Sequence, residues 1–194
     1  MRTIRTKVYK FEELSATAKQ VAISNERDNY GRYGDPLDGF IEFCKEGLKE
    51  KGFGDCELRY SLSNSQGDGL SFKTTNLDIE RFIKESIPTV KTSVLNALKS
   101  IFEWDISGNT GHYTYASKSD VEVEQYDYNK EYDNLTTLAH QVKGYITTEY
   151  LNTCKQLEDI GYQWIESEHN EENVIERLNI NEVEFTIDGK VFNC

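Results

Sequence analysis

Two short segments of the chain carry the residue types that chemistry requires. The first is Ser65-Gln66-Gly67-Asp68-Gly69, where two glycines flank an aspartate. Glycine permits positive φ, so this backbone can turn tightly or approach a ligand closely, and Asp68 offers a carboxylate to a cation or a ligand hydroxyl. The same composition is ordinary for a hairpin turn. A ligand site at Ser65, Gln66, Gly67, Asp68 and Gly69 and a plain turn are therefore both open interpretations.

The second segment is Gly111-His112-Tyr113-Thr114-Tyr115, which we expect to form a strand. On a strand His112 and Thr114 face one way, and Tyr113 and Tyr115 face the other. An imidazole beside polar groups suits general-base chemistry, and His112 and Tyr113 would join the Asp68 loop if two hairpins pair. A lone histidine on a strand is also ordinary scaffold. We therefore include both residues in the candidate ligand site and assign no catalytic residue.

The cysteines give little support to a metal centre. Cys44, Cys56, Cys154 and Cys194 lie far apart, with no C-x-x-C pair and only three histidines in the chain. We interpret them as free thiols in a reducing cytoplasm, with Cys44 and Cys154 on the core faces of helices. The sequence predicts no metal and no cofactor.

Net charge is concentrated in the last part of the sequence. Residues 1–119 hold 17 basic and 17 acidic residues, whereas residues 120–194 hold 5 basic and 17 acidic ones, which accounts for the net charge of −12. A negative field attracts basic surfaces and repels nucleic acid, and it can imitate the phosphates of a duplex; the other interpretation is a solvated face. The partner-binding residues that we predict are Glu158, Asp159, Glu166, Glu168, Glu171, Glu172 and Glu176.

Apolar periodicity and turn residues predict the elements that position these groups. Ser15 is expected to cap the first helix, Asp35-Pro36 to begin the second, and Gly52 to end the second. The predicted strands are 3–11, 57–63, 70–75, 102–106, 112–116 and 121–124, with a last hairpin over 183–192. The predicted helices are 16–28, 36–51, 78–86, 89–101, 131–167 and 171–178.

This order predicts an α+β protein with one compact domain, 1–194. It would have a mostly antiparallel sheet of hairpins, helices packed on one side and a long C-terminal helical segment. Residues 1–128 would be the charge-neutral α+β part, and residues 129–194 the acidic helical part with the terminal hairpin. No apolar run approaches the roughly 20 residues of a membrane helix, and the N-terminus does not resemble a signal peptide. We expect a cytoplasmic location.

Four stretches resemble small uncharacterised proteins encoded by phages and prophages. They are Lys7-Val-Tyr-Lys-Phe11 with the following residues to Ala22, Ser61-Leu-Ser-Asn-Ser-Gln-Gly-Asp-Gly69, Gly111-His112-Tyr113, and the segment from Cys154 to Glu166. The Ser-Gln-Gly-Asp-Gly motif is the most specific of them. The resemblance implies a phage or mobile-element origin and cytoplasmic action in a host cell. It brings no established activity, cofactor or catalytic residue.

Together these features predict a non-enzymatic inhibitor of anti-CRISPR type, a counter-defence protein. Its acidic C-terminal surface would act as a DNA mimic and enter the basic channel of a host nucleic-acid-handling effector. It would bind no nucleic acid and no membrane directly. One alternative is a ligand-binding or metal-dependent enzyme domain, a nucleotide sponge or hydrolase, with its site at the Gln66–Gly69 loop and His112. A second alternative is an antitoxin-like interaction protein.

Overall fold

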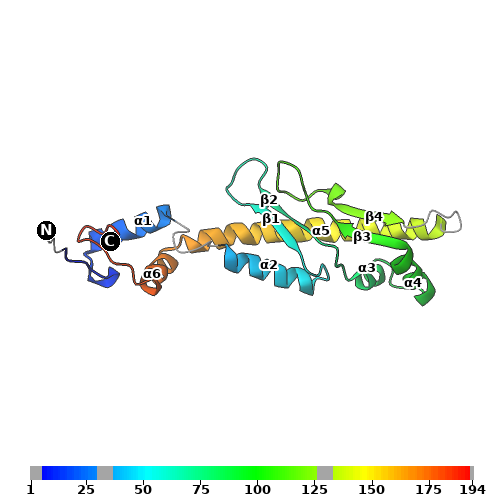
Figure 1. The fold of residues 1–194 in the computed structure, drawn as a ribbon, viewed down its shortest axis with the longest axis horizontal. Coiled ribbons are helices and arrows are strands. Elements are labelled where there is room, and N and C mark those ends of the chain that lie inside the picture. The colour runs from blue at the N-terminus through cyan, green and yellow to red at the C-terminus, as the bar shows by residue number, and fades with distance from the viewer. Residues whose placement is uncertain (1–5, 30–36, 126–132, 193–194) are drawn as a thin grey trace, which may run out of the picture. The chain divides into compact units, whose positions relative to one another are not determined.

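The computed structural model describes residues 6–29, 37–125 and 133–192, with Asp133 described by its backbone alone. The chain forms two compact units: unit 1 is Met1–Phe40 with Gln163–Cys194, and unit 2 is Ile41–Tyr162. Helices α2 (Asp38–Glu50) and α5 (Asp133–Glu168) each contribute to both units (Figure 1). The position 128/129, where the acidic part was predicted to begin, falls inside unit 2.

Unit 1 is built from the two ends of the chain. Its helices are α1 (Ala16–Asp28) and α6 (Glu171–Ile180), and the Ser15 hydroxyl accepts a hydrogen bond from the Ala18 N–H, as the sequence predicts. One apolar core joins the two ends. It contains Phe11, Leu14, Ala18, Ala22, Ile23, Val174, Leu178, Val183 and Phe185.

Backbone pairing also joins the two ends of the chain in unit 1. Tyr9 and Phe185 exchange two backbone hydrogen bonds of 2.9 Å. The predicted strand 3–11 is therefore a single bridge at Tyr9 within its described part, followed by the 3₁₀ turn Phe11–Glu13. The predicted last hairpin is a tight turn closed by the isolated bridge Phe185–Val191, and it is too short to form two strands.

Unit 2 contains two antiparallel hairpins. Strand β1 (Glu57–Ser61) pairs with β2 (Gly69–Lys73), and β3 (Phe102–Ile106) pairs with β4 (Val121–Gln125). Helices α3 (Ile79–Ser86) and α4 (Thr92–Ile101) lie between β2 and β3 in the chain. Thr74 and Ile106 exchange backbone hydrogen bonds of 2.8 and 3.0 Å, which connect the two hairpins.

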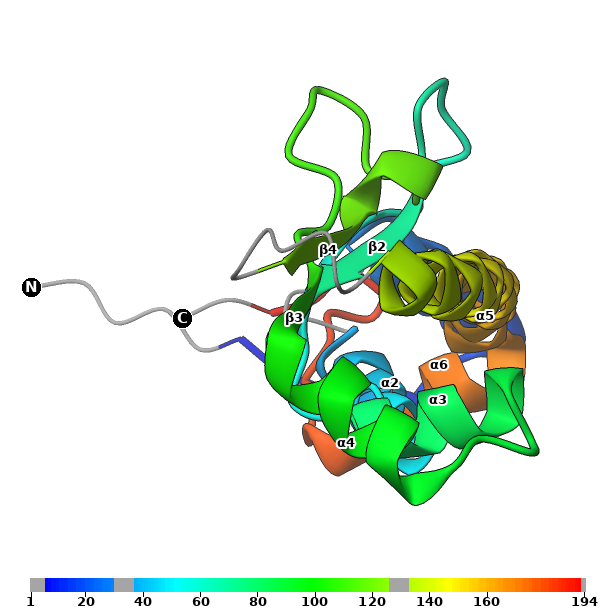
Figure 2. The same ribbon diagram turned by 90° about the vertical axis from the view of Figure 1, so that its right-hand side faces the viewer.

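Aromatic side chains form the centre of the unit 2 core. The ring of Phe72 packs edge-on against the ring of Tyr150 on α5, with 4.8 Å between centroids. Phe53 contacts both Phe72 and Phe82, at 5.0 and 5.3 Å. In Figure 2 the strands lie beside α5, and two loops project away from the helices. The core therefore fixes the hairpins that carry these loops.

One predicted strand is wrong. Residues 112–116 belong to the long connection between β3 and β4, and the partner of β3 is Val121–Gln125. The physical reason is alternation: Val121 and Val123 match Trp104 and Ile106 across the strands and complete an apolar face. The α+β class, the antiparallel hairpins and the long C-terminal helix are confirmed. Within the described ranges, no helix is both long enough and apolar enough to cross a membrane.

Candidate functional site

Asp68 is the centre of a hydrogen-bond network within its own loop. Its Oδ1 accepts from the hydroxyls of Ser61 and Ser65 at 2.7 and 2.9 Å. Its Oδ2 accepts from the backbone N–H groups of Ser63 and Ser65 at 2.6 and 2.9 Å, and from the Tyr162 hydroxyl at 3.2 Å. The Ser61 hydroxyl, and then the Ser65 N–H, hold the pKa of Asp68 well below its usual range. The carboxylate thus organises the loop as an ionised acceptor.

Replacing Asp68 with asparagine is expected to disorder this loop. The amide NH₂ group would stand in place of one carboxylate oxygen, and it would face N–H and O–H donors without accepting a hydrogen bond from them. Folding lowers the pKa of Asp68, so its stabilisation is complete above the ordinary value of 3.8 and is lost as pH falls through the lowered value. In wild-type protein the Ser63 and Ser65 amide signals should keep their folded NMR positions from pH 7 to about pH 4 and collapse only in stronger acid.

The matched control is Gln66→Ala, since Gln66 is exposed in the same loop. This variant should keep the folded Ser63 and Ser65 signals across the same pH range. Equal loss of these signals in the two variants, or no loss in Asp68→Asn, would contradict the assigned role of Asp68.

The two projecting loops are joined by close contacts. The Gly67 carbonyl accepts from both the backbone N–H and the hydroxyl of Thr114, each at 3.1 Å. Gly67 has φ +90°, and a Cβ there would lie 1.9 Å from the Tyr113 ring; at Gly69, φ +150°, a Cβ would lie 2.7 Å from the Tyr115 backbone. The glycines are thus needed for close approach. We call residues 62–68 and 107–117 together the loop head.

His112 lies exposed in the loop head, not on a strand. The rings of His112 and Tyr113 form a T-shaped pair with 5.3 Å between their centroids. The rings of Tyr113 and Tyr115 are stacked with 5.7 Å between their centroids. The structure thus brings the Gly67 loop and Tyr113 together, as the candidate ligand site requires. The hydrogen bonds that the described structure gives Asp68 do not include one from His112. The ligand site at Ser65–Gly69, His112 and Tyr113 stays a prediction.

Burial suppresses thiolate chemistry at the described cysteines. Cys44 and Cys154 are buried on helix faces, as predicted, and Cys56 is half-buried; all three are free thiols. Burial raises the pKa of Cys44 and of Cys56 to about 12, and it raises that of Cys154 further. Cys194 lies outside the described residues. The described part of the chain contains no group of three or more His, Cys, Asp or Glu side chains placed to hold a metal ion.

The predicted partner-binding acids are divided between the units. Glu158 and Asp159 belong to unit 2 and pair with Lys155 at 3.2 and 3.0 Å. Glu168 belongs to unit 1 and pairs with Arg177 at 2.8 Å, so part of its charge is neutralised internally. Four others are exposed in unit 1 and form no ion pair with a described residue: Glu166, Glu171, Glu172 and Glu176.

The fold distributes the charged residues more evenly than the sequence order does. Unit 1 combines the basic N-terminal segment with the acidic C-terminal one, and it holds 9 basic and 14 acidic residues, a net of −5. Unit 2 holds 13 basic and 20 acidic residues, a net of −7. Lys10, for example, donates to the Glu182 carbonyl and lies 3.8 Å from the Glu184 carboxylate. Negative charge is therefore a property of both units.

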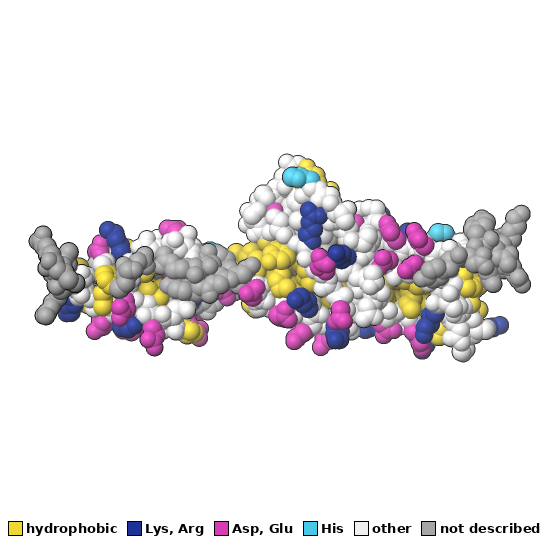
Figure 3. Space-filling view, in the orientation of Figure 1, with side chains coloured by type: hydrophobic (Ala, Val, Ile, Leu, Met, Phe, Trp, Pro, Cys, Tyr) yellow, Lys and Arg dark blue, Asp and Glu magenta, His cyan; other side chains and the backbone are white. Residues whose placement is uncertain are grey.

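The outer side of the β3–β4 hairpin carries four carboxylates. Because Trp104 and Ile106 are buried, the alternate residues of β3 face outward, and the same holds for β4. Figure 3 shows acidic side chains gathered over these two strands. We call this set the acidic face: Glu103, Asp105, Glu122 and Glu124.

Like charges stand directly opposite each other across the acidic face. The register pairs Glu103 with Glu124, and Asp105 with Glu122. Directly opposed like charges destabilise a sheet, and we take the cost to be similar in size to the roughly 0.2–1 kcal/mol that an opposite-charge pair contributes. None of the four carboxylates forms an ion pair with a described residue. By contrast, the other hairpin opposes Glu57 to Lys73, which pair at 2.7 Å.

Two hollows lie beside the acidic face, at Asp105. Asp105 lines both hollows, of about 320 and 250 Å³; Lys73, which pairs with Glu57, also lines the first, and Glu103 also lines the second. Its Oδ1 is shielded from solvent and has no hydrogen-bond partner among the described residues. A shielded acceptor without a partner is unfavourable, and a lysine or arginine side chain that entered either hollow would have the charge and reach to pair with the Asp105 carboxylate.

The acidic face depends on the pairing of β3 with β4 across a long connection, which no local signal in the sequence specifies. Asp120 continues the alternation of Glu122 and Glu124 in the sequence but is not part of the acidic face, because it is buried before β4 and accepts a hydrogen bond from the Tyr150 hydroxyl at 2.8 Å. The signal that the sequence does contain is two matching alternations, Phe-Glu-Trp-Asp-Ile and Val-Glu-Val-Glu.

Comparisons with protein-family models, with curated proteins and with solved structures found no match. The resemblance to phage-encoded proteins stays a prediction.

Proposed function

We propose that this protein is a non-enzymatic binding protein whose acidic face engages a basic, nucleic-acid-binding surface of a partner protein. The observation that carries the proposal is the opposition of like charges in both outward-facing pairs, Glu103–Glu124 and Asp105–Glu122. This arrangement costs the free protein stability, and no described cation offsets the cost. A partner that supplies cations would relieve it on binding.

The proposal refines the predicted inhibitor rather than replacing it. The exposed acidic residues of unit 1 contribute to the negative electrostatic field of the protein. The acidic face differs because the pairing of β3 with β4 fixes the spacing between its four carboxylates. In keeping with the resemblance to phage proteins, we propose a host nucleic-acid-handling defence effector as the partner. Binding should compete with nucleic acid on that effector and weaken steeply with salt, because both ligands would use the same cations.

Neutralising one residue of the acidic face is expected to stabilise the protein. Glu103→Gln removes the repulsion from Glu124, so the free energy of unfolding should rise by about 0.2–1 kcal/mol in low salt. The gain should shrink in 1 M NaCl, where charges are screened beyond roughly 3 Å. Urea unfolding followed by circular dichroism at both salt concentrations measures the effect.

Glu57→Gln is the matched control, because Glu57 is also an exposed strand glutamate but faces Lys73. It should leave stability unchanged or lower it slightly. The proposed cost of the acidic face is wrong if Glu103→Gln is no more stable than Glu57→Gln in low salt. Binding itself is tested separately, by neutralising the whole acidic face and measuring affinity for an arginine-rich peptide.

A further inference from the structure

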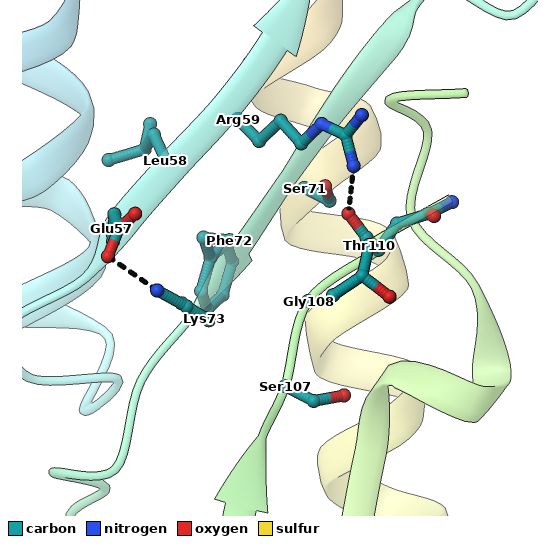
Figure 4. A pocket seen from close by; sticks show the side chains of 10 residues that line it. Glu57, Leu58, Arg59, Ser71, Phe72, Lys73, Ser107, Gly108 and Thr110 are labelled. Carbon is teal, nitrogen blue, oxygen red and sulfur yellow. Dashed lines mark hydrogen bonds and ion pairs between the residues drawn. The ribbon is translucent and has the colours of Figure 1, made fainter. Parts of the chain in front are cut away.

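A small pocket lies where the β1–β2 hairpin meets the loop head, and its lining combines polar side chains with Leu58 and Phe72. It has a volume of about 190 Å³ and is lined by both strands and by residues 107–110 of the loop head. Figure 4 shows Arg59 and Ser71 from the strands and Gly108 and Thr110 from the loop around it. The volume equals that of roughly six water molecules, so the pocket suits a small polar group.

Ser71 is an unsatisfied polar group in this pocket. The residue has 0% exposure, and its Oγ has no hydrogen-bond partner among the described residues. Ser71 stands directly opposite Arg59 in the strand register, so the two side chains share one side of the hairpin. Buried hydroxyls are normally hydrogen-bonded, and leaving one unpaired is unfavourable. Ser71 therefore points to a group that is supplied from outside the chain.

Arg59 places a fixed positive charge beside Ser71. Its Nη1 donates to the Asn109 carbonyl at 2.6 Å, and its Nη2 donates to the Gly111 carbonyl at 2.7 Å. These carbonyls hold the guanidinium without cancelling its charge, and it forms no ion pair with a described carboxylate. Arg81 differs, because it pairs with Glu85 at 2.8 Å. A held guanidinium with spare N–H donors is suited to carboxylate and phosphate oxygens.

We propose that this pocket binds a small oxyanion, the carboxylate or phosphate group of a small molecule. Arg59 supplies the charge, and the Ser71 hydroxyl donates a hydrogen bond to one oxygen. Lys73 also lines the pocket, although it is paired with Glu57. A local cationic site is selective here, because a chain with a net charge of −12 repels anions elsewhere. The proposal is independent of the acidic face.

The test is an NMR titration of ¹⁵N-labelled protein with sodium phosphate and, separately, sodium acetate, at constant ionic strength set with sodium chloride. At least one titrant should shift the Gly108 and Thr110 amide signals and the Arg59 side-chain N–H signal saturably. The arm that saturates at lower concentration identifies the oxyanion. Saturation with neither anion up to about 50 mM would overturn the proposal.

Ser71→Ala is the decisive variant, since it removes an unpaired buried hydroxyl and should fold at least as stably as wild type. It should weaken the saturating anion about tenfold, the loss expected for a hydrogen bond to a charged group. Ser86→Ala is the matched control, because Ser86 Oγ is also buried without a partner and does not line the pocket. Equal affinities of the two variants would overturn the role of Ser71. Arg59→Lys should abolish saturable binding, and unchanged affinity there would overturn the role of Arg59.

Discussion

Arg177→Met is expected to lower the free energy of unfolding by about 3–5 kcal/mol. Arg177 on α6 lies between two carboxylates, with its Nε 3.1 Å from Glu26 on α1 and its Nη1 2.8 Å from Glu168 at the end of α5. The side chain of Glu26 is 1% exposed, and its second oxygen has no described hydrogen-bond partner. Methionine would leave a buried carboxylate without a cation, at the junction of all three helices.

Urea unfolding, followed by tryptophan fluorescence and circular dichroism, measures this loss. Lys155→Met is a control, since Lys155 is 63% exposed and its pairs with Glu158 and Asp159 should contribute less than about 1 kcal/mol. The double variant Glu26→Leu with Arg177→Met should recover most of the stability, because it removes the buried charge together with its partner. A loss below about 1 kcal/mol for Arg177→Met, or no recovery in the double variant, would show that Glu26 does not need its cation.

Local rules predicted the helices of this protein well. Ser15 and Asp78 each accept a hydrogen bond from a backbone N–H in the first turn of their helix, at Ala18 and Arg81. The first hairpin was also predicted, because the loop that ends at Gly69 gives a clear turn signal between two strands. These features depend on residues close in sequence, which propensity and capping describe directly. The predicted start of the second helix, at Asp35-Pro36, lies outside the described residues.

Long-range pairing could not be predicted in the same way. Tyr9 pairs with Phe185 because both ends of the chain bury apolar residues in one core, and no local signal specifies that partner. Similarly, β3 has a nearby turn at Gly108–Gly111, yet its partner begins at Val121. The intervening loop is instead fixed by Arg59, which binds the carbonyls of Asn109 and Gly111. The acidic face and the oxyanion pocket both depend on these pairings.

Neutralising all four carboxylates of the acidic face is expected to reduce the affinity for a basic partner more than any other substitution proposed for this protein. Each exposed ion pair contributes about 0.2–1 kcal/mol, so four pairs with a basic partner amount to about 1–4 kcal/mol, or roughly 5- to 700-fold in affinity. The same substitutions should stabilise the free protein by removing like-charge repulsion. Unfolding therefore cannot account for a loss of affinity. The variant has Gln at Glu103, Glu122 and Glu124, and Asn at Asp105.

The most direct measurement is fluorescence anisotropy with a labelled nona-arginine peptide in 50 and 150 mM NaCl. It compares wild type, the neutralised acidic face, and a control of equal net charge with Gln at Glu166, Glu171, Glu172 and Glu176. We predict that neutralising the acidic face raises the Kd at least about fivefold and flattens its salt dependence, whereas the control raises the Kd less than about threefold. Equal effects of the two sets, or a larger effect of the control, would contradict the acidic face as the binding surface.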